Sequence, residues 1–396
     1  MEPGAEPVIY RSPLPAVAVP ERTVPEHVLH RARHNDEIAL VDAVTDESLT
    51  YAEQVEAVAR GLVRTGIRPG DTVAITSSNR PLFAVGLHAV MAAGATAALI
   101  NPMLTPREIV RLSRPANVSR TLDLDDLPWG GNDSPPPGNP RARAVVLFSS
   151  GTTGVTKAVG LSHRAIVANP EQHRPGWRIG ETDVLAANLP FFHVHGFTII
   201  LDSGLLGGAA LVTMPRGDAG TYLRRLADHR VTRACLMPPL AAAIADHAGP
   251  VPHPRLEHVA PLDDAVRREA ERKLGARVRQ GYGLTEAGGT HQTSDDDGES
   301  DPASIGVLCP GTEARVVEPG TAQAFADGWL RTGDLVRVRD GRFHVVGRVR
   351  KMIRYKGYQV APAELEAVLR RHPPCGTPPS SVRPIGSTVR CRRSSW

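Results

Sequence analysis

The chain has 396 residues, of which 41% are hydrophobic and 22% are charged, which suits a globular protein of two or three domains. It contains no apolar run long enough to span a bilayer, and its start lacks the basic and apolar regions of a signal peptide. The four cysteines show no CxxC spacing, which argues against a zinc site or a disulfide framework, so we expect a reduced, cytoplasmic protein.

The net charge of +4 is concentrated at the end of the chain. Residues 374–396 hold four arginines (Arg383, Arg390, Arg392 and Arg393) and no acid, so the rest of the chain is neutral. The basic balance therefore gives no argument for a nucleic-acid partner.

Helical and strand patterns alternate from Thr50 onward. Thr50 with Glu53, and Thr105 with Glu108, fit capping boxes, and Pro106 suits the first position of a helix. The alternation indicates an α/β fold of layered sheets and helices with largely parallel strands. The expected helices are 50–66, 80–95 and 105–113, and the expected strands are 71–79 and 96–101.

Residues 128–140 (PWGGNDSPPPGNP) predict a loop or linker with no pattern to pack. The alternation resumes at 143–148 and continues to the end of the predicted fold. We expect strands at 143–148 and 232–237, helices at 223–230, 239–247 and 263–274, strand-like structure at 335–348, and a final helix at 362–372.

A phosphate-binding pattern follows the apolar strand 143–148. Residues 148–163 are FSSGTTGVTKAVGLSH, in which hydroxyls, glycines and one lysine crowd together. Glycine lets the backbone approach a ligand, and amides, hydroxyls and a lysine bind phosphate oxygens. The spacing between Gly154 and Lys157 differs from a Walker A loop, which needs Gly-Lys-Ser/Thr in sequence. Taken alone, the segment also fits a polar surface turn.

With this segment, the chain resembles the AMP-forming adenylate ligases, which include acyl- and aryl-CoA synthetases, 4-coumarate–CoA ligase-like proteins, luciferases and peptide-synthetase adenylation domains. The resemblance runs from about Thr50 to His372. Four further segments match in the same order: LPFFHVHGF (189–197), QGYGLTEAGG (280–289), GWLRTGDL (328–335) and GRVRKMIRYKGYQVAPAELE (347–366).

The resemblance implies a large N-terminal adenylate-forming domain, residues 1–346, and only the start of a small C-terminal α+β domain, residues 347–373. It implies that a carboxylic acid is joined to the α-phosphate of ATP, with release of pyrophosphate, and is then passed to the thiol of CoA. ATP, Mg²⁺ and CoA are the implied co-substrates and cofactor, because charge that builds on the α-phosphate needs fixed donors and a cation. No nucleic-acid partner is implied, and the oligomeric state stays open.

The resemblance assigns the ATP phosphates to the loop after residue 148. The departures at Thr156 and Ala158, where the family usually has Pro and Gly, are mild. The implied phosphate-binding residues are Ser149, Ser150, Gly151, Thr152, Thr153, Gly154 and Lys157.

The segment 280–289 is implied to hold the nucleotide. Tyr282, followed by Gly283, would stack on adenine, and Thr285 would donate to the α-phosphate. Glu286 is the implied Mg²⁺ ligand, since its hard oxygens suit a hard cation. Core packing remains an alternative for Tyr282, and a solvated surface acid for Glu286.

Ribose and hinge roles fall near the C-terminal domain. Asp334 would accept from the ribose hydroxyls with support from Arg348, although Gly347 stands where the family normally has Asp. The implied hinge and CoA residues are Arg350, Lys356, Gly357 and Gln359. The alternative for Arg350 and Lys356 is that they are solvated charges on the surface. A hinge would let the small domain rotate between the two half-reactions.

The acid pocket is implied to include His193, His195, Gly281 and Ala287, with His193 beside the substrate carboxylate. If 189–197 is a strand, His193 and His195 point to the same side. The alternative is that both histidines only pack in the protein core. A metal site is not expected here, because the sequence shows no third ligand beside the pair.

Three internal stretches are shorter than in the family: 116–141, 256–264 and 317–328. Losing strands from a packed sheet predicts exposed apolar edges. The chain also lacks the Gly-Lys motif near the family's C-terminus, and no lysine follows Lys356.

The tail offers an explanation for this loss. With GC-rich codons, restoring one C after CAC CC at His372 changes the translation to HPAVRDAAVVG, which suits the family. We therefore expect residues 374–396 to be a frameshifted, disordered tail.

An AMP-forming acyl- or aryl-CoA ligase, impaired in this chain, is thus the favoured interpretation. The alternative is a catalytically dead nucleotide- or acyl-adenylate-binding pseudoenzyme, or a decayed gene product. Peptide-synthetase adenylation is less favoured because Asp202 is the single acid in the segment after 197, and luciferase-like oxidation stays open.

Overall fold

The computed structural model divides the chain into two compact units, Arg11–Thr312 and Met1–Tyr10 with Glu313–Trp396, and each is described by itself. Structural statements here concern the residues whose placement the structure describes. These are 8–32, 39–150, 156–215, 217–247, 255–258, 264–293, 301, 304–317, 325–326, 328–348, 353–355, 358–360, 383–385 and 388–390.

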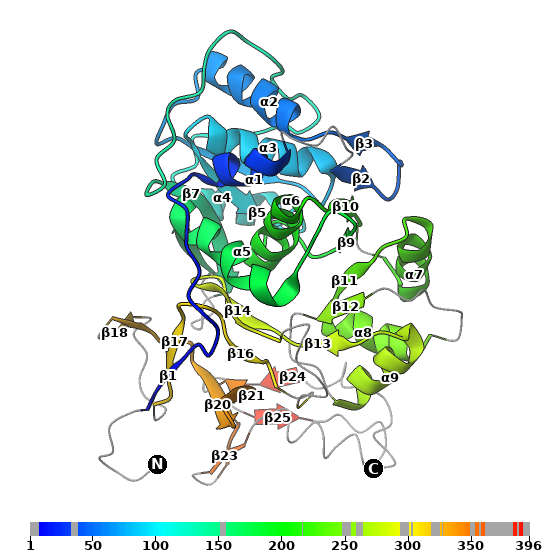
Figure 1. Cartoon of the computed structure of the whole chain (residues 1–396). Helices are drawn as coiled ribbons and strands as arrows, with labels where there is room; N and C mark the ends of the chain where they lie inside the picture. The colour runs from blue at the N-terminus through cyan, green and yellow to red at the C-terminus, as the bar shows by residue number, and fades with distance from the viewer. Residues whose placement is uncertain are drawn as a thin grey trace. The chain divides into compact units, whose positions relative to one another are not determined.

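The unit Arg11–Thr312 contains the helices that the structure describes and two larger sheets (Figure 1). Its helices are α1 (Val24–Ala32), α2 (Ala52–Arg64), α3 (Pro81–Ala92), α4 (Pro106–Ser113), α5 (His163–Trp177), η1 (a π-helix, His195–Asp202), α6 (Ser203–Gly207), α7 (Ala219–Asp228), α8 (Pro238–Ala245) and α9 (Asp264–Leu274).

The first sheet has five strands in the order β6-β4-β5-β7-β8. Its strands are β4 (Thr72–Thr76), β5 (Thr96–Ile100), β6 (Arg120–Thr121), β7 (Arg143–Ser150) and β8 (Thr156–Ser162). Only the pair β7–β8 is antiparallel, so the predicted parallel character is confirmed for the rest of this sheet.

The second sheet has seven strands in the order β13-β12-β11-β9-β10-β2-β3. Its strands are β2 (Leu40–Asp42), β3 (Ser48–Leu49), β9 (Val184–Ala187), β10 (Ala210–Thr213), β11 (Arg233–Leu236), β12 (Arg255–His258) and β13 (Val278–Arg279). All its pairs are parallel except β2–β3. A smaller sheet, β14 (Tyr282–Leu284), β15 (Gly288–Gln292) and β16 (Val307–Leu308), completes the unit.

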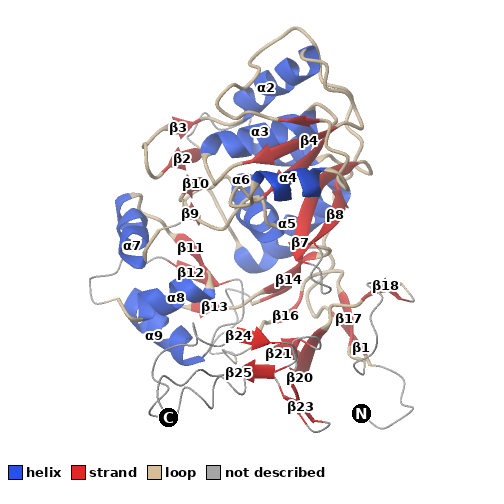
Figure 2. Cartoon of the chain, turned by 180° about the vertical axis from the view of Figure 1, so that it is seen from behind, coloured by secondary structure: helices blue, strands red, loops and turns tan. Residues whose placement is uncertain are grey.

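Both larger sheets are covered on two faces, because neighbouring residues of a strand join different cores. In β5, Ala97 belongs to a large core that also contains Leu211 of β10, whereas Ala98 packs with Ala116 in a small cluster. In β10, Val212 joins a third core with residues of α7, α8 and α9. The layered α/β fold predicted from the sequence is therefore confirmed (Figure 2).

One predicted capping box forms and the other does not. At α4, Thr105 accepts from the backbone of Glu108, and the Glu108 side chain accepts in return from Thr105 N. Helix α2 instead has Tyr51 as its N-cap and no side-chain cap bond, so the prediction for Thr50 and Glu53 is wrong. The Tyr51 side chain is buried, and its hydroxyl donates to Ala84 O, so core packing decides where α2 begins.

The two positions give a matched pair for measuring the cap. Thr105→Ala removes the hydroxyl that accepts from the first turn and is expected to lower the free energy of unfolding by about 1 kcal/mol. Thr50→Ala removes an exposed hydroxyl that caps nothing and should change it by less than about 0.5 kcal/mol. Urea denaturation of both variants checks this, and equal losses would contradict the assignment.

The predicted exposed apolar edge at the first shortened stretch is wrong. The edge strand β6 is short and polar, and Arg120 donates to Thr65 O at 2.8 Å. Leu124 and Leu127 are buried in the large core, and a Cβ on Gly61 of α2 would collide with Pro128 O. Residues 128–140 form no regular element, as predicted, but the start of this loop packs against α2.

A buried polar chain links three helical segments of the large core. His88 of α3 and Asp202 at the end of η1 are 3.1 Å apart through Nε2 and Oδ1, and the Tyr51 hydroxyl contacts His88 Nδ1. Burial raises the pKa of Asp202. Asp202 is 1% exposed and is engaged by His88, so its carboxyl group is part of the core.

The other unit is described as strand pairs: β1 (Ile9–Arg11) with β17 (Glu313–Arg315), β18 (Phe325–Ala326) with β19 (Trp329–Leu330), β20 (Asp334–Arg339) with β21 (Arg342–Arg348), β22 (Ile353–Tyr355) with β23 (Tyr358–Val360), and β24 (Arg383–Ile385) with β25 (Thr388–Arg390). The hairpin β20–β21 confirms the strand-like expectation for 335–348. The expected helix 362–372 lies outside the described residues. The 346/347 domain boundary and the frameshifted tail stay predictions.

Candidate active site

The predicted phosphate loop is the connection of the β7–β8 hairpin. Residues 144–147 of β7 are buried, and the strand becomes accessible at Phe148 and Ser149 as it leaves the core. Ser149 is paired with Lys157 across the hairpin, and Ser150 with Thr156. The hairpin therefore brings the positions of the predicted hydroxyl and cation together at the end where the loop connects the two strands. The loop residues Gly151, Thr152, Thr153 and Gly154 and the side chain of Ser150 lie outside the described residues.

The predicted nucleotide segment is a second hairpin, β14–β15. Its turn holds Thr285, Glu286 and Ala287, and Ala287 N donates to Leu284 O at 3.1 Å. Thr285 and Glu286 are half-buried, and Ala287 is exposed. The tip thus presents a hydroxyl and a carboxylate next to each other, as a phosphate and a cation would need.

The strand leading into this turn, β14, carries Tyr282 and Gly283, and Gly281 comes just before it. Tyr282 is half-buried, and its ring meets the ring of His291 on β15 edge to face at 5.5 Å between centroids. A Cβ on Gly283 would collide with Gly288 O, so the close strand crossing requires glycine. This packing holds the Tyr282 ring in place on one side.

Helix α5 packs against the β14–β15 hairpin and hydrogen-bonds to β15. Asn169 donates from Nδ2 to Gly289 O at 2.9 Å and accepts at Oδ1 from Gly289 N at 3.1 Å. A Cβ on Gly288, whose φ is +69°, would lie 2.6 Å from Asn169 Oδ1, and one on Gly289 would lie 2.6 Å from His173 Cε1. The two glycines of the motif therefore permit the contact with α5.

His173 of α5 extends this contact to the third strand of the small sheet. Its Nδ1 donates to Asn169 O at 2.9 Å, and its Nε2 lies 3.5 Å from Cys309 Sγ. Burial lowers the pKa of His173 to about 4 and raises that of Cys309. A neutral imidazole and an unreactive thiol give both residues a packing role.

The predicted strand at 189–197 is wrong. Residues 191–193 form a turn, Val194 is helical, and η1 begins at His195. A Cβ on Gly196 would collide with Pro190 O, so the chain folds back on itself here. His193 is exposed and His195 half-buried, and the argument from strand alternation that they face the same side no longer applies.

Asn79, just after β4, hydrogen-bonds to the backbone of the residues that precede His193. Its Nδ2 donates to Ala187 O at 2.8 Å and to Leu189 O at 2.6 Å, and its Oδ1 accepts from Phe191 N at 2.8 Å. The ring of Phe192 then packs against that of His193, with centroids 4.7 Å apart. One buried amide therefore fixes the backbone that carries the predicted acid-pocket histidines.

The predicted ribose residues lie in the other unit. Asp334 begins β20 and Arg348 ends β21, and they are direct partners across this hairpin. Asp334 N donates to Thr332 Oγ1 at 3.1 Å. The pairing brings these two positions together, as the ribose assignment requires. Of the predicted hinge and CoA residues, Gln359 lies in β23, and Arg350, Lys356 and Gly357 lie outside the described residues.

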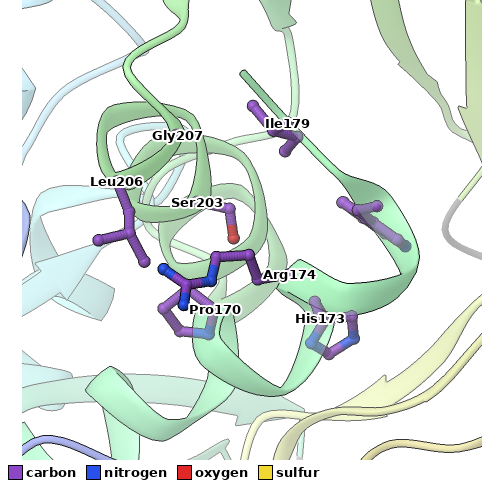
Figure 3. Close-up of a pocket in the computed structure, with 8 residues that line it drawn as sticks. Pro170, His173, Arg174, Ile179, Ser203, Leu206 and Gly207 are labelled. Carbon is purple, nitrogen blue, oxygen red and sulfur yellow. The ribbon is translucent and has the colours of Figure 1, made fainter. Parts of the chain in front are cut away.

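A pocket in the unit Arg11–Thr312 lies between α5 and α6 (Figure 3). Its lining residues are Pro170, His173, Arg174, Trp177, Ile179, Ser203, Leu206 and Gly207. None of the predicted site residues is among them. Within the described part of the chain, no group of three or more His, Cys, Asp or Glu side chains could hold a metal ion, and no helix is long and apolar enough to cross a membrane.

Sequence reasoning missed Asn169 and Asn79, the buried amides behind the two site segments. The signal at Asn169 was available: Asn followed by Pro170 is unfavourable within a helix, and such breaks of local preference gather at functional positions. Asn79 offered no comparable signal, because its partners are more than 100 residues away in the sequence.

Comparison with known proteins identifies the family. The sequence model of the AMP-binding enzyme family matches residues 28–128 and 115–336. The rice (Oryza sativa subsp. japonica) protein "4-coumarate--CoA ligase-like 4" is 30% identical over 92% of this chain and 81% of its own length. "Peroxisomal OPC-8:0-CoA ligase 1" of Arabidopsis thaliana is 29% identical over the same shares.

Solved structures agree on the fold. ATP-bound MatB from Rhodopseudomonas palustris superposes with a TM-score of 0.76 at 21% identity, covering 89% of this chain and 83% of that one. O-succinylbenzoate Coenzyme A Synthetase (MenE) from Bacillus subtilis, in complex with ATP and magnesium, gives 0.75 at 23% identity, covering 88% and 85%. The chain belongs to the AMP-binding enzyme family.

Proposed function

We propose that this chain is an AMP-forming acid–thiol ligase that uses ATP, Mg²⁺ and CoA. The carboxylate oxygen attacks the α-phosphorus of ATP, pyrophosphate leaves, and the CoA sulfur then attacks the acyl carbon of the adenylate and displaces AMP. The observation that carries the proposal is the β7–β8 hairpin, which pairs Ser149 with Lys157 at the ends of a hydroxyl- and glycine-rich loop. Membership of the AMP-binding family supports it.

The β- and γ-phosphates are assigned to this hairpin. Lys157 is exposed at the end of the loop, where its ammonium group is accessible to a phosphate from solvent. Ser149 supplies a hydroxyl donor from the facing strand. The remaining assignments, Ser150, Gly151, Thr152, Thr153 and Gly154, rest on the sequence resemblance.

The α-phosphate and Mg²⁺ are assigned to the β14–β15 turn, with Thr285 as donor and Glu286 as metal ligand. The described residues fit Mg²⁺: it typically takes one or two carboxylates and completes its octahedron with phosphate oxygens and water. The half-buried Glu286 supplies one such carboxylate without a protein cage around it. Bound there, Mg²⁺ would neutralise charge on the phosphates.

The remaining nucleotide contacts are Tyr282 and Gly283 for adenine, and Asp334 with Arg348 for ribose. A ring braced by His291 offers a rigid flat face, and a carboxylate can accept from two neighbouring hydroxyls. The acid pocket is assigned to His193, His195, Gly281 and Ala287. Arg350, Lys356, Gly357 and Gln359 are assigned to the hinge and CoA.

Product analysis with the 396-residue chain tests the proposal. We expect ATP, Mg²⁺, CoA and a panel of aryl, cinnamate-like and medium-chain acids to give AMP and an acyl-CoA thioester, detected by mass spectrometry. AMP release that depends on the acid supports the ligase. If no acid in the panel leads to AMP release, the proposal that this chain is an active ligase is overturned.

A second candidate, a pseudoenzyme that binds nucleotide without turnover, is favoured by one observation: the internal stretches 116–141, 256–264 and 317–328 are shorter than in the family. Calorimetric titration separates the two candidates. Binding of Mg·ATP and a non-hydrolysable acyl-adenylate mimic, without product, supports the pseudoenzyme. A cytoplasmic location is proposed with either candidate, from the cysteine pattern alone.

A further inference from the structure

We infer that Asn169 is a positioning residue, which fixes the Thr285–Glu286 turn relative to the His193–His195 segment through one buried amide. The inference rests on the proposed function, because that turn and that segment are assigned to the nucleotide and the acid. Asn169 itself touches neither substrate in this account. It acts through Gly289 and Thr198.

The turn needs an anchor outside its own hairpin. One described backbone bond closes it, from Ala287 N to Leu284 O, and the pairing of β14 with β15 has an irregular register at Tyr282 and Gly283. A short, irregular hairpin of this kind is marginal without packing from another element. Strand β15 pairs with β16 on its other edge, and helix α5 packs against β15 and bonds to it next to the turn.

The Asn169 side chain supplies this anchor, because its amide both donates and accepts a hydrogen bond, as the backbone of a neighbouring strand would. Its amide donates to Gly289 O and accepts from Gly289 N, at 2.9 and 3.1 Å, so both backbone groups of one strand residue are satisfied by one side chain. These two bonds fix which end of the amide is oxygen and which is nitrogen. Asn169 is 3% exposed, so water cannot replace either bond without a rearrangement.

The same amide oxygen reaches the acid-pocket segment. Thr198 Oγ1 of η1 lies 3.0 Å from Asn169 Oδ1 and 2.9 Å from Val194 O. Its single hydroxyl hydrogen serves one of these acceptors at a time, and Val194 lies between His193 and His195. The Thr198 hydroxyl therefore lies between Asn169 and the backbone of the acid-pocket segment. On its other side, Asn169 hydrogen-bonds to Gly289 of β15, the strand that follows the nucleotide turn.

Asn169→Asp tests the role with little change in volume. The oxygen that accepts from Gly289 N and Thr198 is kept, but the group facing Gly289 O becomes an acceptor, so two oxygens oppose each other in a buried place. We expect the kcat of acid-dependent pyrophosphate exchange to fall about 100-fold, because small misplacements of reacting groups have effects of that size. Apparent Mg²⁺ affinity should fall as well.

Asn79→Asp is the matched control. Asn79 is also a buried amide that donates to backbone carbonyls and accepts from a backbone N–H, but it holds residues 187–191. We expect Asn79→Asp to raise the KM of the acid. Its Mg²⁺ affinity should stay within about threefold of the wild-type value, which corresponds to ~0.65 kcal/mol of binding free energy. If both variants change Mg²⁺ affinity in proportion to their loss of melting temperature, Asn169 is merely structural and the inference is overturned.

Hydrogen exchange of the unliganded variants keeps the inference separate from the proposed function. Asn169→Asp should raise amide exchange in residues 284–292, and Asn79→Asp should not. Unchanged protection of the turn in Asn169→Asp overturns the inference whatever the enzyme does. If Asn169→Asp loses protection of the turn, and the wild-type chain neither exchanges pyrophosphate nor binds Mg·ATP, the anchor is supported and the proposed function is overturned.

Discussion

Glu286→Gln is expected to lower acid-dependent pyrophosphate exchange by about 10²–10³-fold, the range found when one electrostatic contact to a developing charge is removed. The substitution keeps the size and the hydrogen-bonding oxygen of the side chain but removes the negative charge that binds Mg²⁺. Glu286 lies in the turn between β14 and β15, so its replacement does not disturb a core. Melting temperature should change little.

The control for this variant is Glu269→Gln on α9, an exposed acid paired with Arg272 three residues on. Exposed pairs of this kind contribute little, so exchange and stability should both stay near wild type. The Mg²⁺ titration decides the assignment. Glu286→Gln should need a higher Mg²⁺ concentration for half-maximal exchange, and an unchanged Mg²⁺ dependence would show that Glu286 does not hold the metal.

Acid is expected to destabilise the protein well before its carboxylates titrate. Burial lowers the pKa of His163, His173 and His291 to about 4, because the imidazolium form would lose its hydration. In the unfolded chain each histidine has a pKa of about 6.5. Between these values the unfolded state binds more protons, so stability falls as the pH falls from about 6.5 towards 4.

The expected size follows from the proton count. Each buried histidine contributes about 1.4 kcal/mol per pH unit inside this window, so three of them remove roughly 6 kcal/mol between pH 7.5 and 5. That is comparable with the whole stability of an ordinary domain. Asp202 acts in the opposite direction, because burial raises its pKa and the folded state therefore holds its proton more tightly. One opposing group leaves the sign unchanged.

Urea midpoints at pH 7.5, 6 and 5 measure this slope. His291→Gln, which cannot be protonated, should reduce the slope by about one proton equivalent, or about 1.4 kcal/mol per pH unit. A flat stability profile across this range would contradict the buried, neutral histidines.

The layers of the fold could be predicted from the sequence because they depend on local pattern. The expected helices and strands from 71 to 113 and from 223 to 274 correspond to described elements, and the Thr105–Glu108 box forms as expected. Each is set by residues within one or two turns of each other. The connection β7–β8 was also visible, since a glycine- and hydroxyl-rich stretch ends a buried strand.

The site required long-range contacts that local pattern does not contain. The segment at 189–197 alternates like a strand, yet Asn79 holds its backbone from more than 100 residues away and Pro190 lies against Gly196 in a turn. Similarly, Tyr51 enters the core and shifts the start of α2 away from Thr50. Asn169 and Gly289 are 120 residues apart in the sequence. Tertiary packing overrode local preference in each case.

Acid-dependent exchange of labelled pyrophosphate into ATP, measured with the 396-residue chain and Mg²⁺, shows whether this protein adenylates a carboxylic acid. It reports the adenylation half-reaction alone, without CoA. We expect label in ATP with at least one aryl, cinnamate-like or medium-chain acid, and none without acid or without Mg²⁺. No exchange with any acid, together with no binding of Mg·ATP by calorimetry, would contradict it.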